Sequence, residues 1–296
     1  MKSSPKLLVC LVAVVSFAFF GQIAAAQEEK KVKVAQPKGR PLAAGVLKSV
    51  DPEREARETY SRHDLVELVA VDPNFEWAKN VTFKHDVWSL DFKFKPIRMI
   101  WVDVPQPGGK MQRKLVWYMV YSVTNNGKAM HPVLGEDKTY KMTYVDKPVL
   151  FIPEFVLESH EFGKAYPDRI IPVAMDQIQA REGRGNKIHT SVEMTSVKGK
   201  PRKIAVGQTL WGVACWVDVD PKIDRFSVHV YGLTNAYYWK DEPGRYKKGD
   251  ALGTGRRLLQ KTLKLNFWRP GDEYYETERE IRYGIPGEVD YSWGYR

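Results

Sequence analysis

Two segments of the chain share a short residue pattern, and this internal repeat constrains the fold more than any other feature. Each copy has a Trp-Val-Asp-Val strand, which begins at Trp101 in the first copy and at Trp216 in the second. A turn and a second strand follow, led by Tyr121 or Tyr231 and ending in Thr-Asn. The period of about 110 residues is far longer than that of solenoid repeats and close to the size of one β-sandwich domain. The repeat therefore predicts two tandem β-sandwich modules.

The first copy lies in a region with clear strand periodicity. Apolar and charged residues alternate over 90–95, which indicates a strand with one buried and one solvated face. The segment Ile97–Val104 is expected to pair with Leu115–Val123 across a Pro-Gly-Gly turn at 107–109. Residues 115–121 are apolar on both faces, so we expect a central strand that is covered on each side.

The rest of the chain continues this mostly β pattern. The segment Pro172–Glu182, followed by Gly183, predicts a short helix that closes the first module. In the second module, Leu210–Val219 and Phe226–Leu233 are expected to form the second hairpin. The other expected strands are 140–145, 149–157, 188–195 and 258–268.

The first 26 residues have the pattern of an export signal. Lys2 and Lys6 precede a charge-free apolar run that ends in Ala24-Ala25-Ala26. The apolar run is shorter than the ~20 residues that span a bilayer, so cleavage is favoured over a retained anchor. The expected divisions are a signal at 1–26, a flexible leader at 27–50, a helical lead-in at 51–80, and modules at 81–183 and 184–296.

The composition favours an anionic partner. The formal net charge of +10 falls to +8 when the two lysines of the signal are removed. A basic protein in an extracytoplasmic space is suited to contact an anionic envelope polymer or polysaccharide. Nucleic acid is not expected as a partner, since the basic residues are dispersed and no nucleic-acid fold motif is present. No membrane span is expected after signal cleavage, and the oligomeric state is left open.

No motif in the sequence indicates catalysis, a metal or a cofactor. The six histidines show no metal-binding spacing, and Gly-x-Ser-x-Gly is missing. Cys215 lies in an apolar run and is expected to be buried and inert. Ser159-His160-Glu161 is not a triad, because neighbours on a strand point to opposite faces. A glycosidase would need a pair of carboxylates, and the candidates are Glu154 with Glu158 and Glu273 with Glu276. The alternative is that these four residues are ordinary solvated charges.

Clusters of aromatic residues beside basic ones are the best candidates for a binding site. Consecutive aromatics on a strand cannot all face one core, so some are expected to be exposed and able to stack on sugars or to clamp an anionic polymer. The alternative is that they pack the edge of the sandwich. The candidate ligand-binding residues are Tyr237, Tyr238, Trp239, Lys240, Arg245, Trp268, Tyr274 and Tyr275.

Two resemblances add to this interpretation. The pattern Tyr-x-Val-Thr-Asn-x-Gly at 121–127, and more loosely 231–235, resembles a strand-and-turn signature of immunoglobulin-like modules in bacterial surface proteins. At full length the chain resembles uncharacterised secreted proteins of planctomycete-type bacteria, chiefly through residues 88–100 and 115–121. The first resemblance implies immunoglobulin-like modules, and the second implies no activity.

The leading functional hypothesis is an exported, non-enzymatic binding or structural protein of the cell envelope or extracellular space, either periplasmic or secreted. Its aromatic and basic residues in the second module would contact the partner. One alternative is an envelope polysaccharide hydrolase with a cleft between the modules. Another is a pure spacer or assembly module, which predicts a long exposed sheet edge.

Overall fold

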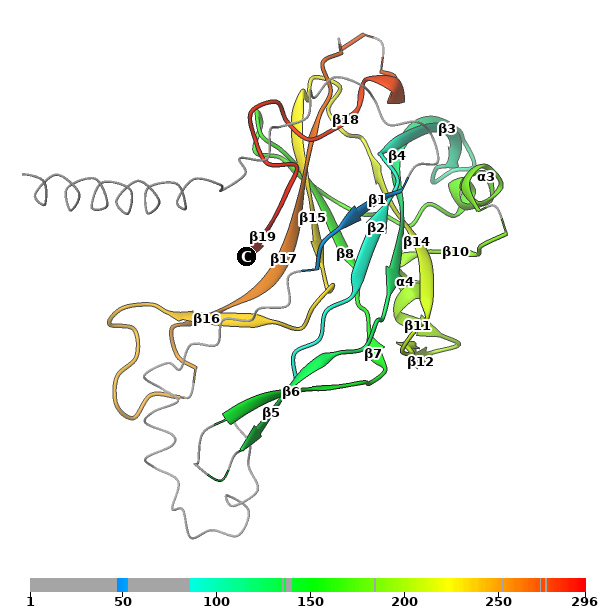
Figure 1. The fold of residues 1–296 in the computed structure, drawn as a ribbon. Helices are drawn as coiled ribbons and strands as arrows, with labels where there is room; N and C mark the ends of the chain where they lie inside the picture. Colours follow the sequence, from blue (N-terminus) through cyan, green and yellow to red (C-terminus); the bar gives the residue numbers. More distant parts are fainter. Residues whose placement is uncertain are drawn as a thin grey trace, which may run out of the picture. The chain divides into compact units, whose positions relative to one another are not determined.

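A computed structural model describes the chain at residues 47–52, 86–134, 136, 140–183, 185–251, 253–271, 273–274 and 276–296. The expected signal, most of the leader and almost all of the helical lead-in lie outside these residues. The protein is mainly β, with several sheets and two α-helices in the described part (Figure 1). Neither of these helices has the length and hydropathy that crossing a bilayer requires.

The first large sheet is built around one long strand. The strand β4 (Met111–Thr124) pairs antiparallel with β14 (Thr209–Val217) on one side. On the other side it pairs with β3 (Arg98–Pro105) over one part of its length and with β2 (Asp91–Phe94) over another. The sheet is completed by β1 (Lys48–Val50) beside β2 and by β10 (Ile188–His189) beside β14.

The second large sheet is organised in the same way around β17 (Arg256–Trp268). This strand pairs with β15 (Arg225–Tyr231), which in turn pairs with β8 (Glu154–Ser159). The sheet continues with β9 (Ala165–Pro167) beside β8. Other parts of β17 pair with β16 (Tyr237–Asp241), β18 (Arg282–Tyr283) and β19 (Tyr291–Tyr295).

Smaller elements surround the two large sheets. Two-stranded pairs are formed by β5 (Ala129–Leu134) with β6 (Tyr140–Val145), by β7 (Val149–Leu150) with β13 (Lys203–Ile204), and by β11 (Ser196–Val197) with β12 (Lys200–Pro201). The helices are α3 (Pro172–Glu182), α4 (Ser191–Thr195) and the short 3-10 helix η2 (Glu278–Glu280).

One hydrophobic core lies between the two large sheets, which pack face to face as in a sandwich. Alternate residues of β4 point into it, and the ring of Tyr121 lies 4.6 Å from that of Phe155 on β8. Trp117, also on β4, lies 5.6 Å from Phe226 on β15. A second cluster covers the other face of the first sheet, where Val116 and Tyr118 pack with Ile178 of α3. The expectation that β4 is central and covered on both faces is confirmed.

The two tandem modules are not confirmed. Strand β4 of the expected first module pairs along its length with β14 of the second, and β8 pairs with β15 in the same way. The main core likewise contains residues from both halves, since apolar faces of all four strands pack together. Neither half therefore encloses a core of its own, and the boundary at 183–184 does not separate two sandwiches.

The repeated segments occupy different positions in the fold. The first copy is a hairpin as expected, because β3 pairs with β4 across the turn at 107–109. The second hairpin is wrong, since β14 and β15 belong to different sheets. The surroundings differ too, because Trp101 is exposed whereas Trp216 is buried. A short pattern of strand residues does not determine which strands will pair.

Three local predictions also need correction. The strand expected at 188–195 is short β10 followed by α4, which Thr190 and Glu193 begin with a capping box. The strand expected at 149–157 is divided into β7 and β8, with Pro153 between them. Within the expected leader, Lys48–Val50 is strand β1, and Val50 is buried in the core. The strand expected at 258–268 and the helix at 172–182 are confirmed.

Candidate functional site

Five of the eight predicted site residues lie on one two-stranded ribbon, here called the β16–β17 ribbon and comprising residues 237–260. Its strands pair from Tyr237 opposite Gln260 to Asp241 opposite Arg256, and the segment 242–255 is the loop that joins them. In the part of the chain that the structure describes, residues 256–259 of β17 pair with no strand except β16. The end of the ribbon is therefore not covered by a neighbouring strand.

The ribbon carries an excess of positive charge. It contains six basic residues against three acidic ones, a formal net charge of +3. Arg256 pairs with Asp241 at 3.3 Å and Arg245 with Glu242 at 3.5 Å, which accounts for two of the cations. The others are Lys240, Lys247, Lys248 and Arg257, all exposed and, within the described residues, without an ion pair.

The aromatic side chains of the ribbon are less available than predicted. Tyr237 and Tyr238 are half-buried, and as neighbours on a strand they point to opposite faces. The ring of Tyr238 packs edge-on against Tyr295 of β19, with ring centroids 5.4 Å apart. The backbone of Trp239 lies on β16, but its side chain is not among the described ones. The alternative reading, in which such aromatics pack an edge, holds for Tyr238.

Of the remaining predicted residues, Trp268 lies away from the ribbon. Trp268 is at the opposite end of β17, eight residues beyond Gln260, which corresponds to about 27 Å along a strand. Its ring lies 5.3 Å from the guanidinium carbon of Arg282. Tyr274 is 90% exposed, and Tyr275 lies outside the described residues. Trp268 and the predicted residues of the ribbon therefore do not form a single site.

A polar row that the sequence analysis did not find crosses the outer face of the second sheet. His160 Nε2 lies 2.6 Å from Ser227 Oγ, and Ser227 Oγ donates to Asn266 Oδ1 at 2.8 Å. The amide orientation of Asn266 is fixed because its Nδ2 donates to the carbonyl of Val289. The hydroxyl proton of Ser227 is therefore engaged with the Asn266 amide oxygen, so His160 Nε2 donates its proton to Ser227 Oγ. The pair is not an activated nucleophile, and the serine is also fully buried.

Beside this row, Glu158, His229 and Arg296 form a second polar group. Arg296 Nη2 lies 2.6 Å from Glu158 Oε2, and Nη1 donates to His229 Nε2 at 2.7 Å. Burial lowers the pKa of His229 to about 4, and the charge of Arg296 acts in the same direction. The histidine is consequently neutral near pH 7. In the sequence, the polar residues of both groups show only a period-two pattern at 158–160 and 227–229. Such a pattern does not show that the two strands pair.

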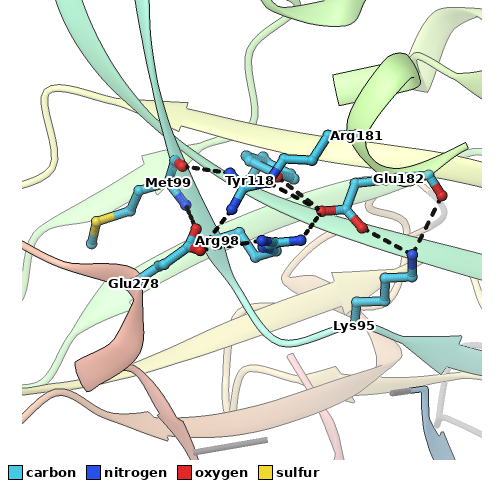
Figure 2. A network of polar contacts seen from close by, with 7 residues as sticks. All are labelled: Lys95, Arg98, Met99, Tyr118, Arg181, Glu182 and Glu278. Atoms are coloured by element: carbon cyan, nitrogen blue, oxygen red, sulfur yellow. Dashed lines mark hydrogen bonds and ion pairs between the residues drawn. The ribbon is translucent and has the colours of Figure 1, made fainter. Parts of the chain in front are cut away.

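The most extensive buried polar network connects α3 to the first sheet (Figure 2). Glu182, the last residue of α3, accepts hydrogen bonds from Lys95 Nζ at 2.9 Å and from the Tyr118 hydroxyl at 3.0 Å, and it also pairs with Arg98. Burial acts to raise the pKa of Glu182, but the hydrogen bond from Lys95 and the charge of Arg98 lower it overall. The carboxylate is held ionised and surrounded by donors, so it has no free proton to exchange with a substrate.

A second carboxylate completes the network. Glu278 Oε1 accepts from Arg98 at 3.2 Å and from Arg181 at 2.7 Å, and its Oε2 accepts from the backbone N–H of Met99 at 3.1 Å. Arg181 also donates to the carbonyl of Met99. These contacts join η2, α3 and β3 (Figure 2). Their role is architectural.

Comparison with known proteins gave no match, since no protein-family model, no curated protein and no solved structure is similar to the chain.

Proposed function

We propose that the chain is an exported, non-enzymatic binding protein whose β16–β17 ribbon contacts an anionic polymer of the cell envelope or extracellular space. The observation that carries the proposal is the group of four exposed cations on this ribbon without an ion pair in the described part of the chain. Charges that no partner neutralises retain their full attraction for a polyanion. Export is inferred from the charge and hydropathy pattern of the first 26 residues.

The ribbon geometry supports a polymer rather than a small ligand. Lys240 lies on β16 and Arg257 opposite it on β17, while Lys247 and Lys248 lie in the loop. The four cations therefore lie at two places along the ribbon, one cross-strand pair and one pair in the loop, instead of converging on one point. A linear polyanion can follow such an element and contact several cations at once, which a small ligand cannot do.

The test uses polygalacturonate as the probe. The triple variant Lys240→Gln, Lys247→Gln, Lys248→Gln should elute from immobilised polygalacturonate at a lower salt concentration than the original protein. The control is Lys187→Gln, Lys198→Gln, Lys200→Gln, which removes the same charge from exposed positions elsewhere. Equal shifts in the two triple variants would show that only net charge matters and would contradict the proposal.

The hydrolase alternative receives no support from the candidate carboxylates. Glu154 and Glu158 are four residues apart on β8, so their backbones are about 13 Å apart, beyond the 5–10 Å of glycosidase pairs. Glu158 is also paired with Arg296. Of the other pair, Glu273 contacts Lys222 at 3.1 Å, and Glu276 has a pKa raised by burial. The binding role is therefore preferred.

A further inference from the structure

Trp101 is unusual among the tryptophans of this protein. Of the tryptophan side chains that the structure describes, it alone is exposed, with 52% of its surface accessible. Indole combines a large apolar body with a polar N–H, and such amphipathic rings are enriched at binding interfaces. The residue belongs to the first copy of the sequence repeat, where its counterpart Trp216 is buried.

The position of the ring follows from the alternation of the β3–β4 hairpin. Val102 is buried in the cluster beneath α3, which fixes that face of the hairpin against the body of the protein. Trp101 and Asp103 point to the opposite face. Leu115 and Arg113 lie directly across from them on β4. The exposed face is thus held on a paired strand rather than on a loop.

Two charged residues share this face of the hairpin with the ring. The guanidinium carbon of Arg113 lies 5.4 Å from the centre of the Trp101 ring. Asp103 is the cross-strand partner of Arg113, yet within the described residues neither side chain forms an ion pair. A planar donor and a carboxylate acceptor therefore stand beside the exposed indole, both available to a ligand.

We propose that Trp101, Asp103 and Arg113 form a binding site for a pyranose unit of a polysaccharide. A pyranose ring has an apolar C–H face and a rim of hydroxyl groups. The indole accepts the apolar face, Asp103 accepts hydrogen bonds from hydroxyls, and Arg113 donates hydrogen bonds to hydroxyl oxygens. Because the three residues lie on paired strands, little ordering entropy is lost on binding. The site is separate from the β16–β17 ribbon and does not depend on it.

The balance of charge at the site favours a neutral sugar ring over an anionic or an apolar ligand. One acid and one base flank the ring, so the site has no net charge and offers both a donor and an acceptor. A strongly anionic ligand would be repelled by Asp103, and a purely apolar surface would leave two charged groups without partners. A neutral polyhydroxylated ring satisfies all three residues.

The test is electrophoresis of the full chain through native gels that contain a neutral soluble polysaccharide, with hydroxyethylcellulose, galactomannan and arabinoxylan as probes. At least one probe should retard the protein, and Trp101→Ala should weaken that retardation about fivefold or more, equivalent to roughly 1 kcal/mol. Asp103→Asn and Arg113→Gln should weaken it less. Tyr144→Ala removes another exposed aromatic ring and should leave it unchanged.

Several outcomes would overturn the site. These are no retardation by any of the three probes, equal retardation of Trp101→Ala and the original protein, or equal loss in Tyr144→Ala. A fall in molar mass of Trp101→Ala by light scattering would instead assign the ring to contact between two copies of the chain. Trp101→Phe should fold and keep part of the binding, which separates loss of stacking from loss of structure. The triple lysine variant of the ribbon should bind these neutral probes normally, so failure of one proposal is distinguishable from failure of the other.

Discussion

The hydroxyl of Tyr118 donates a 3.0 Å hydrogen bond to Oε1 of Glu182, which joins the central strand of one sheet to the last residue of α3. The same carboxylate binds Lys95 and Arg98, and the side chains of Glu182 and Lys95 are both almost fully buried. When the partner of a buried cation is removed, neither water nor an opposite charge stabilises the cation, and the folded protein loses stability. Glu182 therefore carries the buried charge pairing between α3 and the first sheet.

Glu182→Gln should therefore lower the free energy of unfolding by about 3 kcal/mol, because it leaves Lys95 charged and buried without a counter-ion. The measurement is urea denaturation followed by tryptophan fluorescence. Glu242→Gln is the control, since its pair with Arg245 is exposed and should contribute less than about 1 kcal/mol. A loss in Glu182→Gln no greater than in the control would show that the network does not stabilise the fold.

Asn125 predicts a second large effect. Its amide donates to the carbonyls of Lys147 and Ile204 and accepts from the N–H of Gly127, so one buried side chain satisfies three backbone groups. Asn125→Ala should cost about 2–4 kcal/mol, because three backbone groups would lose this partner, two of them at buried positions. Asn126→Ala is the matched control, as this neighbour is exposed. Thermal unfolding of the two variants should differ clearly, and similar midpoints would contradict the assignment.

The strands could be predicted from the sequence because each is determined locally. Alternation along 90–94 and the Pro-Gly-Gly turn at 107–109 depend only on neighbouring residues, and the structure confirms both. Lys95, which the same pattern placed on the solvated face, is instead buried against Glu182. The helix at 172–182 was predicted for the same reason, from Pro172 at its start and Gly183 at its end. The strand-and-turn signature at 121–127 likewise ends in a turn, where Gly127 has a φ of +69° and its N–H donates to Asn125 Oδ1.

The partners of the strands could not be predicted in this way. Strands β14 and β15 follow one another in the chain, yet each pairs with a strand more than 60 residues away in sequence. Nothing local distinguishes this arrangement from a hairpin, because both give the same alternation of buried and exposed residues. The polar row of His160, Ser227 and Asn266 depends on that pairing and was missed for this reason.

The pKa of His229 predicts how stability changes with pH. Burial depresses it from the ordinary 6.5 to about 4, so the unfolded chain binds the proton more readily than the folded protein. The contribution of His229 is fully present above pH 6.5 and is lost as the pH falls to 4, by at most about 3 kcal/mol. His229→Asn should reduce the dependence of the urea-denaturation midpoint on pH between pH 4 and pH 6.5. If the midpoint of the variant changes with pH as steeply as that of the original protein, His229 is not the cause of the pH dependence.

Cys215 should be chemically silent in the folded protein. It is buried, and burial raises the pKa of its thiol to about 12, so almost no thiolate forms near neutral pH. In protein lacking residues 1–26, a thiol reagent such as Ellman's should react with less than about a tenth of a thiol per chain until urea is added. Fast labelling without denaturant would show that the first sheet opens where β14 meets α3.

The salt dependence of binding gives the final prediction, which concerns the β16–β17 ribbon. If its lysines displace counterions from a polyanion, the logarithm of the binding constant for polygalacturonate should fall linearly with the logarithm of the salt concentration. Each lysine in contact adds to the slope, so replacing Lys240, Lys247 and Lys248 with glutamine should reduce its magnitude by up to about three. The control lysines 187, 198 and 200 should leave the slope nearly unchanged, because removal of distant charge alters long-range attraction but no direct contact. Titrations at four salt concentrations would separate the two cases, and a slope that falls equally in both variants would remove the ribbon as the contact surface.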